Sequence, residues 1–192
     1  MMKLAYSPAS PYARKVVILA MEAGLDSKIE RIPTAVRPDQ PNLELGKDNP
    51  LMQIPTLIAE GGETLYDSRV ICAYLDVLNP GPKLIPVSGG ERWAALRLEA
   101  LGDGITDAGI LVRYETALRP EALRWKEWIA GQTKKVDQGL DLLEAHPEML
   151  TGPLNIGQIA VACGIGWMNF RAVFGDCLVN RPKLAAWYAM IG

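Results

Sequence analysis

The sequence predicts an α/β domain at the N-terminal side, followed by a domain built only of helices. Three observations carry this prediction. Strand and helix patterns alternate over residues 1–78. Six Pro and Gly residues then interrupt every pattern within residues 79–90, which is typical of a linker. Only helical periodicity recurs over residues 91–192, the predicted second domain.

The first domain begins with a strand, a tight turn and a helix. The run Leu4–Tyr6 predicts the strand, and Ser7–Lys15 then opens an amphipathic helix that extends to about Ala23. Ser10 stands at the N-cap position of this helix. Pro11 stands at the first helical position, where the missing N–H costs nothing. Donors at such a helix start can face a bound anion.

The rest of the first domain predicts three more strands and a second helix. The alternation of residues 28–32 predicts a strand parallel to the first. Residues 55–59 and 64–66 predict a hairpin whose turn is Gly61-Gly62. The pair Asp67-Ser68 is expected to cap a helix over residues 69–78.

The second domain is predicted as a bundle of four helices. A capping box formed by Ser88 and Glu91 is expected to open the first of them. The third is nearly all apolar and rich in Gly and Ala, so it is expected at the centre of the bundle. The four helices are expected to reach about Leu118, to run from Pro120 to His146, from Asn155 to Phe170, and from Pro182 to Ile191.

Composition excludes several classes of function. The net charge is −2 and no basic run occurs, which argues against a nucleic-acid-binding protein. Three cysteines without a CxxC spacing fit a reducing compartment better than a disulfide framework. The longest apolar stretch, residues 159–170, is too short to span a bilayer, and no secretion signal is apparent. We therefore expect a soluble cytoplasmic protein.

Four local motifs occur together at matching spacings. They are SPYARK at residues 10–15, NPLMQIPTL at 49–57, YDS at 66–68, and the capped apolar helix that begins at Asn155. Over nearly its whole length the chain therefore resembles the cytosolic glutathione transferase family, in particular bacterial members with a serine-type site. The resemblance implies a thioredoxin-like first domain, a helical-bundle second domain, and glutathione as co-substrate without a metal.

Transfer of glutathione to an electrophile requires a thiolate, but a free thiol has a pKa of about 8.5. Lowering this pKa by about two units needs roughly 2.7 kcal/mol of preferential thiolate stabilisation. A helix N-terminus contributes about 0.3–1 kcal/mol and a charge-assisted hydrogen bond roughly 1.5–3 kcal/mol. Ser10 offers both, so it is the predicted catalytic residue. Tyr6, in the place of the catalytic phenol of tyrosine-type members, and Ser7, in the same loop, are its rivals.

The resemblance also implies the glutathione contacts. A cis bond between Ile54 and Pro55 would let the Ile54 backbone pair with the cysteinyl part, as in strand addition. Gln53 would reach the polar ends of glutathione. Ser68 would receive the γ-glutamyl carboxylate at a helix start, and Asp67 would hold the ammonium. With Ser at position 10 in place of Cys, disulfide exchange through this site is not expected.

The second substrate is predicted only as an apolar electrophile. Its pocket residues are expected to be Ala9, Tyr12, Ile110, Leu111 and Tyr114. The resemblance further implies a homodimer that joins residues 64–78 of one subunit to the long helix of the other. A solvent-exposed or interface role is expected for Asp103 and Asp107, and an exposed first-turn role for Lys15. The cysteines are expected to be buried small hydrophobic residues.

Two classes of function remain at this point. One is an enzyme that transfers glutathione to hydrophobic electrophiles or uses it to reduce peroxides. The alternative is a catalytically weak module of the same fold that binds ligands or proteins. The presence of Ser10, of Ile54-Pro55 and of Asp67-Ser68 favours the enzyme.

Overall fold

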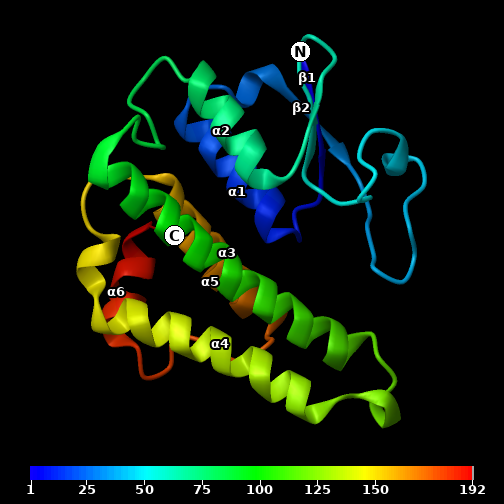
Figure 1. Cartoon of the computed structure of the whole chain (residues 1–192), viewed down its shortest axis with the longest axis vertical. Helices are drawn as coiled ribbons and strands as arrows, with labels where there is room; N and C mark the ends of the chain where they lie inside the picture. Colours follow the sequence, from blue (N-terminus) through cyan, green and yellow to red (C-terminus); the bar gives the residue numbers. More distant parts are fainter. Residues whose placement is uncertain (192) are drawn as a thin grey trace. The chain divides into compact units, whose positions relative to one another are not determined.

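The computed structural model describes residues 1–191, which form two compact units that meet in sequence between Val87 and Ser88. Figure 1 traces the chain through both units. The first unit contains β1 (Met2–Tyr6), α1 (Pro11–Glu22), β2 (Ile29–Pro33), β3 (Thr56–Ile58), β4 (Thr64–Leu65) and α2 (Ser68–Leu78). The second contains α3 (Gly89–Ala117), α4 (Lys126–Ala145), α5 (Ile156–Arg171) and α6 (Pro182–Ile191).

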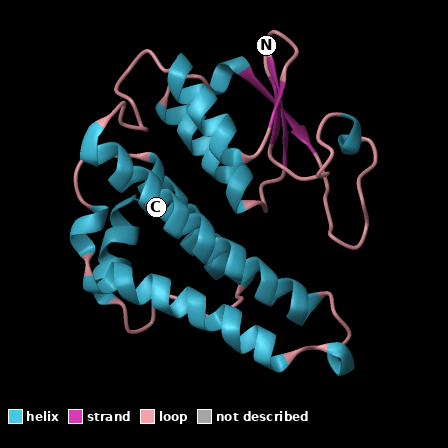
Figure 2. Cartoon of the chain, in the orientation of Figure 1, coloured by secondary structure: helices cyan, strands magenta, loops and turns pink. Residues whose placement is uncertain are grey.

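The first unit is a mixed four-stranded sheet with two helices packed together. The strand order is β2-β1-β3-β4, with β1 parallel to β2 and antiparallel to β3. Helices α1 and α2 lie side by side, and α2 also contacts β3 (Figure 2). The predicted parallel pair and the predicted hairpin are both confirmed. The predicted fold class, an α/β domain followed by an all-helical one, is confirmed as well.

Lys15 corrects the expectation of an exposed first-turn cation. Its side chain is only 1% exposed. It lies four residues from Pro11 and four from Leu19, which are also buried, so it belongs to the inward stripe of α1. The methylene groups of the lysine suit this apolar stripe, and its buried ammonium needs a partner, which the structure supplies. The first turn of α1 therefore presents Arg14, not Lys15, to solvent.

The predicted linker is tied to the end of α2. The buried carboxylate of Asp76 accepts hydrogen bonds from the backbone N–H groups of Leu84 (2.8 Å) and Ile85 (3.2 Å). The ammonium of Lys83 donates to the carbonyls of Asp76 and Asn79, each at 2.7 Å. Asp76 O also accepts from the N–H of the C-cap residue Asn79 at 3.2 Å, and the cation adds a further partner at this helix end that favours the helix dipole.

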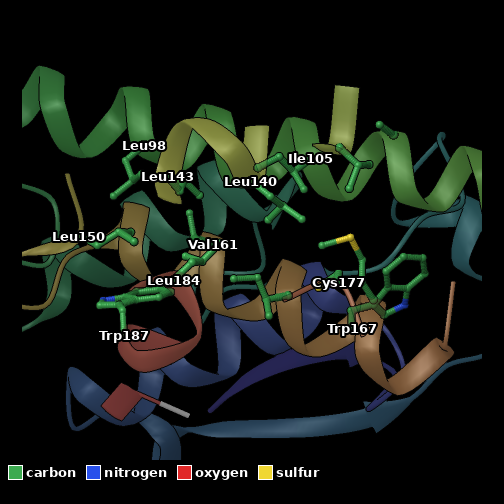
Figure 3. Close-up of a cluster of buried hydrophobic side chains, with 14 residues drawn as sticks. Leu98, Ile105, Leu140, Leu143, Leu150, Val161, Trp167, Cys177, Leu184 and Trp187 are labelled. Atoms are coloured by element: carbon green, nitrogen blue, oxygen red, sulfur yellow. The ribbon is translucent and has the colours of Figure 1, made fainter. Parts of the chain in front are cut away.

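The second unit is a bundle with α5 at its centre. Eleven of the sixteen residues of α5 are buried. Figure 3 shows the cluster they join, with Leu98 from α3, Leu140 from α4, Val161 from α5 and Leu184 from α6. The prediction that the Gly- and Ala-rich helix occupies the centre is confirmed. None of the described helices is both long enough and apolar enough to cross a membrane.

The two predicted capping boxes have different outcomes. At the start of α5, Asn155 Oδ1 accepts from Gln158 N (3.3 Å), and Gln158 Oε1 accepts from Asn155 N (3.2 Å). At the start of α3, the side chain of Ser88 makes no capping hydrogen bond, so that prediction is wrong. Gly89 has a φ of +77°, and this left-handed residue separates Ser88 from the regular helix it would cap.

Helices α3 and α5 approach closely and run in the same direction. A Cβ added to Gly102 on α3 would lie 2.7 Å from the backbone nitrogen of Val161 on α5. Farther along, a Cβ at Gly109 would lie 3.3 Å from the Trp167 ring and 3.6 Å from Met168. At these contacts the residue numbers increase in the same direction along both helices, so α3 and α5 are parallel.

We predict that Gly102→Ala lowers the free energy of unfolding by about 1–3 kcal/mol, because the new methyl forces the two backbones apart. Gly104 on the same helix has no atom within 4 Å of an added Cβ. Gly104→Ala should therefore be neutral or stabilise by up to about 1 kcal/mol. Urea unfolding of both variants measures the difference, and equal effects would contradict the close packing of α3 on α5.

Glu115 joins the end of α3 to the start of α4. Its buried carboxylate accepts from the backbone N–H of Trp125 (2.9 Å) and from Arg119 Nε (2.8 Å). The Trp125 N–H, followed by Arg119, holds the pKa of Glu115 below its ordinary value. The native state thus prefers the carboxylate more strongly than the unfolded chain does.

The stability contributed by Glu115 should be complete above the unfolded-state pKa of about 4.3 and be lost as the pH falls through the lower folded value. We predict that Glu115→Gln destabilises the protein at pH 7, and that its difference from wild type shrinks toward pH 3. Glu121→Gln, at an exposed position, is the control. Denaturant unfolding across this pH range measures both, and a pH-independent difference for Glu115→Gln would refute the assignment.

Candidate active site

Strand pairing brings three loops to one edge of the sheet. Ala5, next to the last residue of β1, pairs with Thr56, the first residue of β3. Leu57 pairs with Leu65, the last residue of β4. The end of β1, the start of β3 and the end of β4 therefore lie at the same edge. The segments that meet there are residues 6–10, 53–55 and 66–68.

The width of the sheet at this edge matches the length of a short extended peptide. Neighbouring strands are about 4.8 Å apart, so β1 and β4, with β3 between them, are separated by roughly 10 Å. An extended tripeptide spans about 10 Å. Helices α1 and α2 both begin within the converging segments, at Pro11 and Ser68. Their N-termini carry partial positive charge, so the edge favours an anionic peptide.

Ser10 is the N-cap of α1, as predicted. Its Oγ accepts a hydrogen bond from Ala13 N at 3.2 Å, and its own N–H donates to Ser7 O at 3.0 Å. A hydroxyl that accepts one hydrogen bond still has its proton to donate. The side chain is half-buried. Ser10 can therefore cap the helix and donate to an anion at the same time.

The two rivals of Ser10 are engaged differently. The ring of Tyr6 lies under the guanidinium of Arg31, 5.9 Å from its centroid. Arg31 belongs to β2, which flanks β1 on the side opposite β3. Ser7 Oγ accepts from Ala9 N at 3.3 Å within its own turn. Of these three residues, only Ser10 combines a hydroxyl with the start of a helix.

The segment before β3 leaves a backbone position open. The Ile54–Pro55 peptide bond is cis, as expected. Among the described residues none hydrogen-bonds to the backbone N–H or C=O of Ile54. The neighbouring Gln53 has an exposed side chain, while its carbonyl accepts from Asn49 Nδ2 (3.1 Å) and Thr56 Oγ1 (2.8 Å).

Asn49 is a positioning residue that the sequence analysis treated only as part of a motif. Its side chain is 1% exposed and also donates to Thr56 Oγ1 at 2.9 Å. Its Oδ1 accepts from Leu51 N at 3.0 Å. A buried amide with three partners holds the Gln53–Pro55 turn in one shape. The signal in the sequence was the Asn-Pro pair, which marks a turn start.

Asp67 and Ser68 begin α2. Asp67 is exposed, and its Oδ1 accepts from Arg69 N at 3.0 Å, which confirms the predicted cap. Ser68 is buried at the first helical position. The Tyr66–Asp67 peptide bond before them is also cis. The structure thus brings Ser10, Ile54 and Ser68, which are distant in sequence, to one edge.

The residues predicted for an electrophile pocket come from both units. Ala9 and Tyr12 are half-buried at the start of α1. On α3, Leu111 and Tyr114 are 39% and 38% exposed, whereas Ile110 packs in part against the helical core. Asp107 is exposed, but Asp103 on the same helix is buried, which corrects the expectation of a solvated pair. No group of three potential metal ligands is found among the described residues.

Comparison with known proteins identifies the family. The family "Glutathione S-transferase, N-terminal domain" matches residues 9–78. The "Uncharacterized GST-like protein YibF" of Escherichia coli K12 is 35% identical over 189 residues, which cover 95% of this chain and 90% of that protein. The chain belongs to the glutathione transferase family.

Solved structures of the family are closely similar to this chain. A glutathione transferase family member from Pseudomonas fluorescens Pf-5 with bound glutathione superposes with a TM-score of 0.96 at 43% identity, covering 100% of this chain and 94% of that one. A structure of a family member from the same organism with bound S-(propanoic acid)-glutathione gives a TM-score of 0.92 at 41% identity, with the same coverage. The predicted glutathione transferase fold, with its thioredoxin-like first domain, is therefore confirmed.

The three cysteines of this family member are all buried, as predicted, and no disulfide joins them. Burial, more than the nearby Asp176 carboxylate, raises the pKa of the Cys177 thiol to about 11. At pH 7 almost none of this thiol is the reactive thiolate.

We predict that native protein reacts slowly with a disulfide reagent such as 5,5′-dithiobis(2-nitrobenzoate) at pH 7, because the thiols are shielded and, at Cys177, protonated. Three equivalents should react rapidly in guanidinium chloride. Release of the coloured thiolate measures both rates. A rapidly reacting thiol in the native state would contradict the burial of the cysteines.

Proposed function

We propose that this protein is an active glutathione transferase, in which Ser10 stabilises the glutathione thiolate for attack on hydrophobic electrophiles or peroxides. The observation that carries this proposal is the convergence of residues 6–10, 53–55 and 66–68 at one edge of the sheet. Supporting it, the Pseudomonas fluorescens relative holds glutathione and an S-substituted glutathione.

The start of α1 supplies two terms that favour a thiolate. The proton on Ser10 Oγ is available because the cap uses only a lone pair of that oxygen. A hydrogen bond to a charged group contributes roughly 1.5–3 kcal/mol, and the helix N-terminus adds about 0.3–1 kcal/mol. Together they lower a thiol pKa by about 1.3–3 units. From a pKa of about 8.5, a shift larger than about 1.5 units makes the thiolate the main form at pH 7.

The remaining contacts orient the tripeptide. In our proposal the cysteinyl part pairs with the backbone N–H and C=O of Ile54, which adds a short strand to the sheet edge. The γ-glutamyl carboxylate lies at the N-terminus of α2 beside Ser68, and Asp67 holds the ammonium group. Pro55 shapes this turn, and Gln53 reaches the polar ends of the ligand.

The electrophile is proposed to contact Leu111 and Tyr114 on α3. Their exposed aliphatic side chain and ring suit an apolar acceptor. The thiolate sulfur forms the new bond to the acceptor, and the leaving group departs with its electron pair. With a peroxide, the sulfur attacks the terminal oxygen, the O–O bond breaks, and the alkoxide leaves with the electron pair. A second glutathione thiolate then attacks the sulfenic sulfur, which gives glutathione disulfide and releases hydroxide.

Two measurements distinguish the proposed enzyme from the alternative, a binding module without turnover. Only the enzyme conjugates 1-chloro-2,4-dinitrobenzene or reduces cumene hydroperoxide. Retention on immobilised glutathione without either activity would favour the module. Failure to bind glutathione would also favour the module and would contradict the proposed enzyme.

We also propose a cytoplasmic homodimer that uses α2 and β4 of one subunit against α3 of the other. The support is the apolar surface of α2, where Val70 is 48% exposed and Val77 is 76% exposed. Multi-angle light scattering tests the oligomeric state, and Val77→Glu should shift it toward monomer.

We predict that Ser10→Ala raises the apparent pKa of bound glutathione by about 1–2 units, because one charge-assisted hydrogen bond is lost. Absorbance of the bound thiolate near 240 nm as a function of pH measures this value. Tyr6→Phe and Ser7→Ala should leave it within about 0.3 units, since neither hydroxyl stands at the helix start.

Ser10→Ala also removes a helix cap, which costs about 1 kcal/mol of stability. Ser10→Thr keeps both the cap and the hydroxyl, so it separates stability from chemistry. Recovery of the wild-type pKa in Ser10→Thr is expected. An unchanged pKa in Ser10→Ala, or a raised one in Tyr6→Phe, would overturn the assignment to Ser10.

A further inference from the structure

Two arginines, Arg113 and Arg171, lie near each other just beyond the segment where α3 packs against α5. The helices run parallel, with Gly109 of α3 against Trp167 and Met168 of α5. One turn beyond these positions, the same register places Arg113 of α3 beside Arg171, the last residue of α5. The electrostatic influence of Arg113 on Arg171 agrees with this placement, since it lowers the Arg171 pKa in addition to the larger effect of burial.

The two guanidinium groups lack a carboxylate partner. Arg37, Arg119 and Arg181 are each hydrogen-bonded to an Asp or Glu side chain. Within residues 1–191, no such partner occurs for Arg113 or Arg171. Like-charged groups placed together in a folded protein without a counterion are unfavourable unless a ligand supplies the charge.

Arg171 is only partly solvated. Its Nε is buried and makes no hydrogen bond, which among the described side chains is true of this atom alone. Its Cζ lies 5.1 Å from the centroid of the Phe170 ring, so the guanidinium rests on an exposed aromatic face. A guanidinium positioned in this way offers its planar edge to a bidentate anion.

The surroundings on α3 are those proposed for the electrophile. Ile110, Arg113 and Tyr114 stand at i, i+3 and i+4, on one face of the helix. Tyr114 is 38% exposed, and its electrostatic interaction with Arg171 acts to raise the Arg171 pKa. An apolar surface thus borders a positively charged pair within the same helical unit.

We propose that Arg113 and Arg171 bind the carboxylate of the acceptor substrate, so that this transferase prefers electrophiles with an aromatic or aliphatic body and a carboxylate group. This inference rests on the proposed function. Each arginine forms charge-assisted hydrogen bonds to the carboxylate, while Tyr114 and Phe170 contact the body of the molecule. A helix-capping role for Arg171 alone would affect stability and leave substrate preference unchanged.

A matched pair of acceptors tests the proposal: 4-chloro-3,5-dinitrobenzoate and the neutral 4-chloro-3,5-dinitrobenzamide. In both, the glutathione sulfur bonds to C4 and chloride leaves with the electron pair of the broken bond. The wild type should show the higher kcat/KM with the benzoate after correction for the uncatalysed rates. Arg171→Met and Arg113→Met should each lower kcat/KM for the benzoate by about tenfold or more and that for the amide by less than about twofold.

Two further variants sharpen the comparison. Arg97→Met removes an exposed arginine of the same helix and should leave both acceptors unaffected. Arg171→Lys keeps the charge without the planar fork, so the loss with the benzoate should be intermediate. Arg171→Lys also tests the proposal if Arg171→Met does not fold. Equal losses with the benzoate and the amide, or no loss with either, would overturn the proposal.

Failure of the proposed function gives a different result. If the wild type transfers glutathione to neither acceptor and does not reduce cumene hydroperoxide, that function is wrong. Calorimetric titration of the two acceptors without glutathione then tests the arginine pair by itself. Tighter binding of the benzoate, lost in Arg171→Met, would support the carboxylate site. Equal binding of the benzoate and the amide would overturn it.

Discussion

The antiparallel pairing of β1 with β3 is the constraint on which the candidate site depends. Opposing Ala5 and Thr56 places the end of one strand beside the start of the other. β4 then returns along β3 and ends at the same edge. Residues 6–10 meet residues 53–55 and 66–68, which follow more than forty residues later in the sequence, only because of this register. A shift by one residue would also turn buried Leu4 and Leu57 outward, so the hydrophobic core holds the register in place.

Capping side chains serve both the fold and the proposed chemistry. Ser10 and Asp67 satisfy backbone donors at the starts of α1 and α2, which stabilises each helix without a ligand. The same ends are positively polarised and adjacent, so the unliganded protein already has the electrostatics that an anionic peptide requires. Little reorganisation would then accompany binding, and the buried amide of Asn49 holds the third loop ready.

In the helical unit, the close packing of α3 against α5 determines which side chains lie together. Gly102 lets the backbones of α3 and α5 nearly touch, and the parallel register that follows carries Arg113 and Arg171 to the same end. Side chains larger than hydrogen at Gly102 would separate the helices and with them the two guanidinium groups. Cys163 on α5 is only 3% exposed, so it is shielded from oxidants in solution.

The sequence by itself determined the order and type of the elements, because helical and strand periodicity and caps such as Asn155 are local signals. It also identified Ser10 and Asp67 as caps. Only the tertiary structure decided which side chains are buried and which loops meet. Lys15 and Asp103 are buried although charge favours exposure, and the Ser88 cap is absent because Gly89 takes a left-handed conformation. Such outcomes, like the meeting of Arg113 with Arg171, depend on contacts between distant segments, which local patterns do not encode.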